Sequence, residues 1–221
     1  MRFSKGGVLA LLLFGVGCTS AALADTVVNI PGPTIGYADF GDSALADSWT
    51  QDFSVTNGSI SVYVQGLEPS GGTINFYLTT DIGPTATLSD LVAFTSLQVP
   101  FELTPETPFS DLNLGPGTYY LILADYTPNN NPVDGPDWNY YSGETNILTA
   151  PGVTVNPAEA AFALGPYAPA ASYEPLSIDI RGVMSFTGTI VPTAPTPEPS
   201  SVLLLAATLF AFGVAHFKRS R

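Results

Sequence analysis

The chain has 221 residues, with 19 acidic and six basic residues, one histidine and one cysteine, and its formal net charge at pH 7 is −13. This balance excludes nucleic-acid binding, because neutralising phosphates requires several Lys or Arg residues. The single histidine, His216, lies near the C-terminus, and no lysine lies between positions 25 and 195. Ser–His–Asp catalysis, Cys–His catalysis and histidine-rich metal sites are therefore excluded there.

Residues 1–24 have the organisation of a secretory signal peptide. Cleavage by signal peptidase after Ala24 leaves a mature chain that starts at Asp25 and has no cysteine, because Cys18 is removed with the signal. Such a chain has neither disulfides nor thiol chemistry. Lipoprotein processing at Cys18 is the alternative, but Gly15 stands where a large aliphatic residue is usual. The parts of the signal are basic residues at Arg2 and Lys5, an apolar run at 8–16, and small residues at Ala22 and Ala24.

Residues 25–191 are predicted to form one β-rich domain. Apolar and polar residues alternate through 59–65, 73–79 and 177–190, which is the pattern of half-buried strands. The run 118–124 is apolar on both faces and predicts a central strand. Many short strands separated by Pro and Gly predict an antiparallel β-sandwich or jelly roll. Further strands are predicted at 48–56, 92–99 and 153–155, and short helical turns at 88–91 and 158–163.

Glycines add local detail to this prediction. The Asn57-Gly58 pair precedes a serine and so fits a glycosylation acceptor, but it is also typical of a tight hairpin turn, which we favour. Gly182 and Gly188 interrupt the last predicted strand and indicate bulges or bends.

Charge in the predicted domain is almost entirely negative. All acidic residues except Glu198 lie between positions 25 and 195, against one basic residue, Arg181, which is predicted to pair with Asp179. The only enzyme chemistry left is that of carboxylates, above all glycoside hydrolysis by two acidic residues. Solvated acids on a secreted surface explain the same composition, so we predict a protein that is not an enzyme.

The segment 125–144 carries two candidate binding sets. Its carboxylates suit Ca²⁺, the one cofactor for which ligands are present, although the order of a dedicated calcium loop is missing and the same residues are typical of a long turn. Its aromatic residues suit stacking on sugar rings, or alternatively core capping by the tryptophan. The calcium candidates are Asp125, Asp134 and Asp137, with a weaker group at Asp39, Asp42 and Asp47, and the sugar-binding candidates are Trp138, Tyr140 and Tyr141.

The C-terminal end is predicted to contain a membrane-spanning helix. Residues 192–201 form a Pro-rich linker, residues 202–217 contain no charge and predict a transmembrane helix, and residues 218–221 form a basic tail. At about 1.5 Å per residue the helix spans roughly 24 Å, shorter than a hydrocarbon core of about 30 Å. The basic residues that stay in the cytoplasm are Lys218, Arg219 and Arg221.

Residues 196–221 resemble the PEP-CTERM sorting signal of Gram-negative bacteria, in which a Pro-Glu-Pro motif precedes a hydrophobic helix and a short basic end. The motif here is Pro197, Glu198 and Pro199, preceded by Thr196 where the family usually has Val. The resemblance implies an exosortase as partner, which cuts near the motif and passes the protein to the surface. An ordinary single-span anchor is the alternative.

The central region is similar to the β-sandwich ectodomains that carry such signals. The similarity lies in Trp49, Phe53 and Val55 and in the segment 112–121. It implies a structural or adhesive protein of the envelope or exopolysaccharide matrix. The alternatives are a carbohydrate-binding module and, after it, a carboxylate glycosidase.

Overall fold

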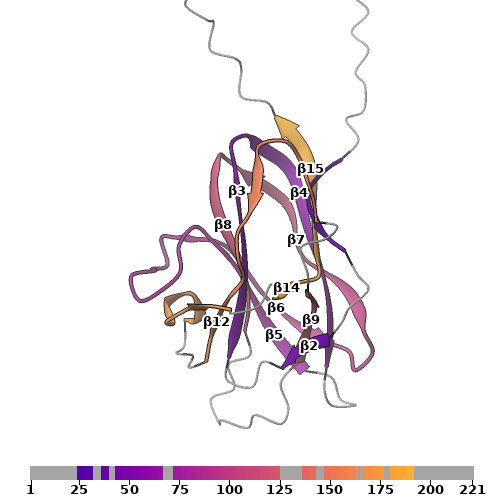
Figure 1. The fold of residues 1–221 in the computed structure, drawn as a ribbon, viewed down its shortest axis with the longest axis vertical. Helices are drawn as coiled ribbons and strands as arrows, with labels where there is room; N and C mark the ends of the chain where they lie inside the picture. Colours follow the sequence, from indigo (N-terminus) through magenta and orange to yellow (C-terminus); the bar gives the residue numbers. More distant parts are fainter. Residues whose placement is uncertain are drawn as a thin grey trace, which may run out of the picture.

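The structure is a computed structural model that describes residues 24–31, 36–39, 43–66, 72–124, 136–142, 147–162, 164, 167–176 and 180–191, and for 36–39, 136–142 and 180 it describes the backbone alone. Two β-sheets account for all the strands of the described residues (Figure 1). The first sheet contains β1 (Asp25–Ile30), β2 (Gly36–Asp39), β4 (Ser54–Gly66), β7 (Thr104–Leu114), β9 (Pro136–Ser142), β10 (Leu148–Thr149), β14 (Ile180–Gly182) and β15 (Met184–Val191). The second contains β3 (Ala44–Gln51), β5 (Gly72–Thr79), β6 (Leu91–Val99), β8 (Gly117–Ala124), β11 (Val153–Val155), β12 (Glu159–Ala161) and β13 (Glu174–Pro175). A 3-10 helix, η1, spans Ala168–Ala170.

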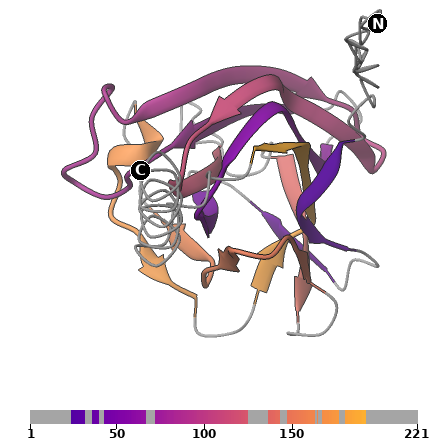
Figure 2. The same ribbon diagram turned by 90° about the horizontal axis from the view of Figure 1, so that it is seen from above.

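Every strand pair among the described residues is antiparallel, and no α-helix occurs there. The prediction of a mainly β, antiparallel fold is therefore confirmed. The first sheet has the order β10-β1-β15-β4-β9-β14, with β7 added beside β4 and β2 beside β9. The second has the order β13-β12-β3-β8-β5-β6, with β11 added beside β3. In the view from above, β12 and β14 lie on the side opposite β6 (Figure 2).

The main core joins the two sheets through aromatic side chains. Trp49 of β3 lies 5.3 Å from Phe186 of β15 and 5.8 Å from Tyr119 of β8, measured between ring centroids. All three side chains are buried. Fully burying a side chain of this size contributes roughly 1.5–3 kcal/mol, so this contact between the sheets accounts for a substantial part of the stability.

Strand β8 is the central strand that its composition predicts. It lies between β3 and β5 in the second sheet. Leu121 and Leu123 belong to the main core, whereas Ile122 and Ala124 belong to a second apolar cluster on the opposite face of the sheet. The segment around η1 covers that opposite face, because Ala168 and the half-buried Tyr167 and Tyr173 pack there. A strand covered on both faces has no solvent side, which explains its continuous apolar sequence.

The predicted strand 48–56 is wrong as a single element, because the chain leaves the second sheet after Gln51 and enters the first sheet at Ser54. The buried amide of Gln51 stabilises this sheet change. Its Nε2 donates to the carbonyl oxygens of Phe53 (3.0 Å) and Gly115 (3.1 Å), while its Oε1 accepts from Nε1 of Trp49 (3.0 Å). Local alternation does not reveal such a sheet change, because each half of the segment has strand character.

The predicted hairpin turn at Asn57-Gly58 is also wrong, because both residues lie inside β4. Asn57 has φ 51°, and the pairing of β4 with β7 shifts register between Val55 and Gly58, so the residues form a bulge. The pairing of β15 with β4 shifts between Thr187 and Thr189, around Gly188. That shift and the break between β14 and β15 after Gly182 confirm the bends predicted from Gly182 and Gly188.

The alanine-rich segment 158–163 is not a helical turn. Residues 159–161 form β12, which pairs with β3 so that Ala160 lies opposite Leu45. The edge of β3 offers hydrogen-bond partners that outweigh the helix propensity of alanine. Residues 88–90 do form a turn, in which the amide of Asp90 donates to the carbonyl of Thr87, and Leu91 already belongs to β6. The 3-10 helix η1 was not predicted.

Candidate functional site

Most of the predicted site residues fall where the structure gives no side chain. Trp138, Tyr140, Tyr141 and Asp137 lie on β9, between β4 and β2, where Trp138 pairs with Val64 and with Ala38. Ala24 is exposed directly before β1, which starts at Asp25. Asp39 is the last residue of β2 and lies opposite Asp137 of β9. Except for Asp47, the other candidates lie outside the described residues, namely Asp125, Asp134, Asp42, Ala22, Pro197, Glu198, Pro199, Lys218, Arg219 and Arg221.

Asp47 is the exception, and its position differs from that of a surface calcium ligand. Asp47 lies on the same face of β3 as Leu45 and Trp49, which are two residues before and after it. Its side chain therefore points into the space between the sheets, and it is 1% exposed. Its Oδ2 accepts a 2.6 Å hydrogen bond from the amide of Gly182 on β14, in the other sheet. Its Oδ1 has no hydrogen-bond partner among the described residues. The carboxyl group therefore bridges the two sheets with one oxygen and leaves the other unsatisfied.

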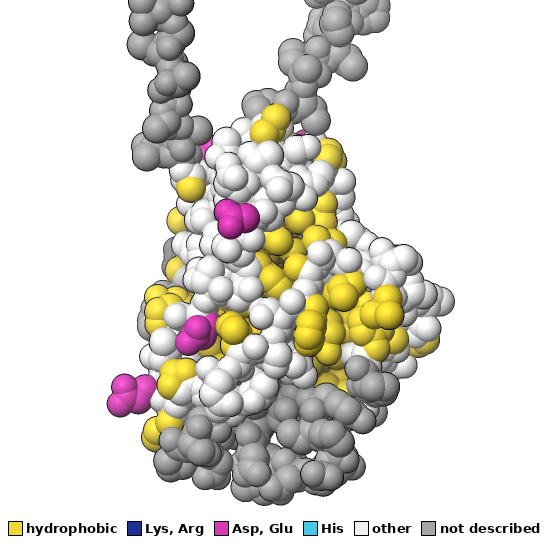
Figure 3. Space-filling view, turned by 180° about the vertical axis from the view of Figure 1, so that it is seen from behind, with side chains coloured by type: hydrophobic (Ala, Val, Ile, Leu, Met, Phe, Trp, Pro, Cys, Tyr) yellow, Lys and Arg dark blue, Asp and Glu magenta, His cyan; other side chains and the backbone are white. Residues whose placement is uncertain are grey.

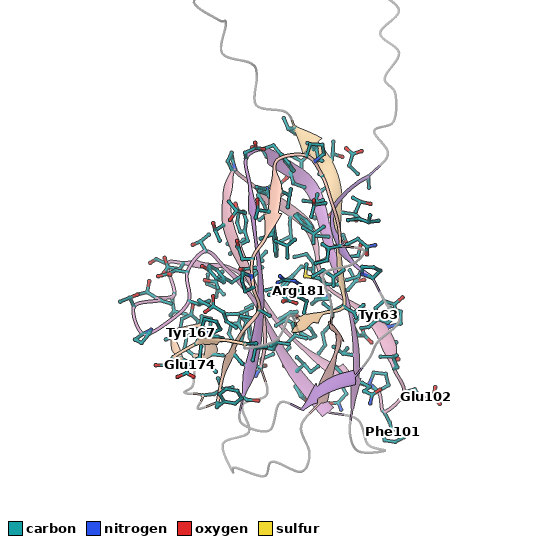
Figure 4. The ribbon with its side chains drawn as sticks, viewed as in Figure 1. Tyr63, Phe101, Glu102, Tyr167, Glu174 and Arg181 are labelled. Atoms are coloured by element: carbon teal, nitrogen blue, oxygen red, sulfur yellow. The ribbon has the colours of Figure 1, made fainter. Side chains whose placement is uncertain are left out.

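Arg181, the residue before Gly182, belongs to the same interior polar group. It is half-buried, and Figure 4 shows it near the middle of the view of the domain. Its Nη1 donates to the carbonyl oxygen of Asn156. Asn156 is in turn held against β3, since its Nδ2 donates to Oγ of Ser48 (3.1 Å) and its amide to the carbonyl of Ser48 (2.9 Å). The predicted partner Asp179 lies outside the described residues, so that pairing stays a prediction.

Burial dominates the electrostatics of Asp47. Desolvation raises the pKa of Asp47 to about 7, against smaller lowering effects of the Gly182 hydrogen bond and the Arg181 charge. A carboxyl group with such a pKa is a candidate acid or base wherever substrate reaches it. Asp47 is closed to solvent, so its raised pKa bears on folding stability and not on a reaction with a glycan. In the sequence, the signal for this position is that Asp47 stands at the middle of an every-second-residue series with the apolar Leu45 and Trp49, which places an acid on an inward face.

A second feature is an accumulation of exposed apolar side chains around β6. Of the nine large hydrophobic residues exposed among the described residues, five occur within residues 88–103. We call these five the apolar strip. Figure 3 shows hydrophobic side chains gathered on one face of the domain, with acidic side chains to one side of them. The strip consists of Leu88, Val92, Phe94, Phe101 and Leu103.

The ring of Phe94 is supported from beneath. It is 51% exposed and its centroid lies 4.8 Å from that of Tyr77 on β5, which is buried. Tyr77 in turn contacts Tyr167 edge to face at 6.0 Å, and the Tyr167 hydroxyl donates to the carbonyl of Thr87 (2.9 Å). Within the strip, Phe94 therefore rests on packed aromatic side chains. The charge-free, proline-free run 92–99 is the sequence signal for this part of the strip, and by itself it predicts only a strand.

The described residues contain no group of three or more His, Cys, Asp or Glu side chains arranged to hold a metal ion. Within the same part of the chain, no helix is long and apolar enough to cross a membrane. What the fold and site define is a mainly β, antiparallel, two-sheet protein with a buried carboxylate and an exposed apolar strip. No protein-family model matches the chain, and no curated protein resembles it in sequence.

Proposed function

We propose that this chain is an exported protein of a bacterial envelope or exopolysaccharide matrix, with a structural or adhesive role, delivered to the cell surface by a PEP-CTERM-type signal. The observation that carries the proposal is the order of segments in residues 196–221: Pro-Glu-Pro, then an uncharged apolar stretch, then a basic end. In this proposal residues 1–24 act as signal helix, the domain is a β-sandwich or jelly roll, and residues 202–217 form the transmembrane helix. Signal peptidase and an exosortase are the processing partners.

The boundaries of the fold support this organisation. The first strand starts at Asp25, the residue after the expected cleavage position, and the last strand ends at Val191, before the Pro-rich linker. These two strands are antiparallel neighbours, and Asp25 lies opposite Gly188. Both ends of the domain therefore lie at one end of the sheet. An anchor after Val191 would leave the opposite end, with Phe101 and Glu102 at its tip (Figure 4), facing away from the membrane.

Replacing Pro197, Glu198 and Pro199 by alanine tests the sorting step in a host that supplies an exosortase. Proline keeps this segment extended and withholds a backbone donor, so the substitution removes the conformation as well as the motif. We expect membrane insertion to persist, release to fail, and uncut chain to accumulate in the inner membrane. The matched control replaces Pro192 and Pro195 by alanine, upstream of the motif. If the motif variant reached the surface at the normal rate and size, residues 202–217 would be an ordinary anchor.

A carbohydrate-binding module is the alternative function, based on the aromatic residues of β9. A glycan array separates the two, because a structural protein gives no saturable binding whereas a module binds one class of glycan. Substituting Trp138 and Tyr140 by alanine abolishes such binding if those rings stack on the sugar. A carboxylate glycosidase requires two acidic residues about 5–10 Å apart in an accessible cleft, and hydrolysis of the bound glycan would be its sign.

A further inference from the structure

Strand β6 ends the second sheet, and its outer edge pairs with no other strand of the described residues. Its nine residues, Leu91–Val99, contain no charge, no proline and no glycine. Exposed and half-buried side chains alternate along it, so one face packs against the domain and the other faces solvent. An edge of this kind presents a row of backbone donors and acceptors to an incoming strand.

The edge of the other sheet is protected. Strand β7 lies beside β4 at the border of the first sheet and contains Pro105 and Pro108, which cannot donate to a ladder. It also carries Glu106 and Asp111, the latter with φ 56°, and its pairing with β4 shifts register three times. These are the features by which proteins prevent edge-to-edge association. Their presence on β7 and absence from β6 distinguish β6 as an edge that is open to pairing.

We propose that β6 is a self-association surface, on which a second copy of this chain adds its own β6 in antiparallel register about a two-fold axis at Thr95. This register overlaps all nine residues and places Phe94 opposite Ser96 of the other copy. Such an interface is isologous, since each copy contributes the same patch. The inference goes beyond the proposed function and does not depend on how the protein is exported.

The apolar strip favours a second copy as the occupant. In this register the exposed Val92 and Phe94 of one copy lie opposite Gln98 and Ser96 of the other, and Leu88, Phe101 and Leu103 lie beyond the two ends of the paired strands. The exposed side chains of Val92 and Phe94 thereby gain neighbours from the second copy. The two sheets join into one continuous sheet across the axis.

The net charge of the chain also favours a second copy that pairs through β6. Two copies of a protein with net charge −13 repel each other over most of their surface. The pairing at Thr95 brings together two strands that carry no charge, so that no two carboxylates face each other along the paired residues. The strip is thus a place where two copies can approach without direct acid–acid contact.

Cysteine cross-linking tests the register in the full chain, purified in detergent with Cys18 replaced by serine. Two Thr95→Cys side chains lie across the axis at a Cα separation of about 4.5–5.5 Å, within disulfide reach. In this register Val92 of one copy lies opposite residue 98 of the other, six residues from the second Val92. Two Val92→Cys side chains therefore lie roughly 20 Å apart and form no disulfide. We expect a disulfide-linked dimer on mild oxidation of the first variant only. Equal cross-linking of the two variants would overturn the proposal.

Sedimentation velocity tests the association itself. Ser96→Lys adds a charge on the exposed face of β6, and we expect it to weaken dimerisation at least tenfold while leaving the far-ultraviolet circular dichroism unchanged. Ser110→Lys makes the same substitution at an exposed position of β7 and is the matched control, expected to dimerise as the parent chain does. Self-association through β6 would be contradicted if the parent chain stayed monomeric at 100 µM, roughly a hundred times a dissociation constant of 1 µM. Equal effects of the two lysines would contradict it as well.

Discussion

Replacing Asp47 with asparagine is the sharpest test of the interior polar group. The side chain keeps its shape and its acceptor for the amide of Gly182, but loses the ability to ionise. The pKa of Asp47 rises from its ordinary value of 3.8 to about 7, chiefly through burial. At about 1.4 kcal/mol per pKa unit, this difference of about three units corresponds to an effect on the order of 4 kcal/mol.

The sign follows from proton linkage. Between pH 4 and 7 the folded state keeps a proton on Asp47 that the unfolded state releases. The contribution of this group to stability is therefore complete below pH 4, is lost as the pH rises to 7, and stays absent above pH 7. The asparagine variant has no such dependence. We expect the free energy of unfolding of the parent chain to fall between pH 4 and 8 by about 4 kcal/mol more than that of Asp47→Asn.

Urea denaturation at pH 4, 5, 6, 7 and 8, followed by tryptophan fluorescence, measures this difference, because Trp49 is buried beside the group. Asp111→Asn is the matched control. It removes one exposed carboxylate on β7, and asparagine tolerates the positive φ at that position. The control corrects for general repulsion in an acidic protein as the pH rises. Parallel stability curves for Asp47→Asn and the parent chain over this range would refute the interpretation.

Three further predictions concern single residues. Gln51→Ala removes the amide that binds Trp49, Phe53 and Gly115, and we expect the free energy of unfolding in urea to fall by about 1–3 kcal/mol. Thr50→Ala, on the exposed face of the same strand, is the control and should change it by no more than about 0.5 kcal/mol. Equal effects of the two substitutions would contradict the role of Gln51. Gly188→Ala places a Cβ 2.4 Å from Cγ1 of Val55 and 3.1 Å from Cα of Gly58, and should lower the free energy of unfolding by about 1–3 kcal/mol. The control is Gly115→Ala, whose Cβ meets no atom within 4 Å. Thermal denaturation compares the two variants, and equal melting temperatures would show that the bulge accommodates the added Cβ. Intact mass of the exported protein should give Asp25 as the first residue, and a lipid-modified Cys18 at that end would disprove signal peptidase cleavage after Ala24.

Local pattern was sufficient to predict the strands with strong alternation. Ile60, Val62 and Val64 alternate with polar residues and lie in the core side of β4, and the doubly apolar run 118–124 is the central strand β8. The period of two determines these elements because each neighbour along a strand points to the opposite face. The glycines themselves predict the bends at positions 182 and 188, and at Gly188 a Cβ would lie 2.4 Å from Cγ1 of Val55.

Tertiary structure decided which sheet each strand joins. The change of sheet after Gln51, the bulge at Asn57-Gly58 and the strand at 159–161 depend on partners that are distant in sequence, β7, β15 and β3. Pairing between distant strands is worth more than a local turn or helix preference, and local sequence does not record it. The position of Asp47 between the sheets and that of β6 at the end of the second sheet have the same origin. The sequence by itself determined which residues face inward along a strand, and only the assembled sheets decided what lies across from them.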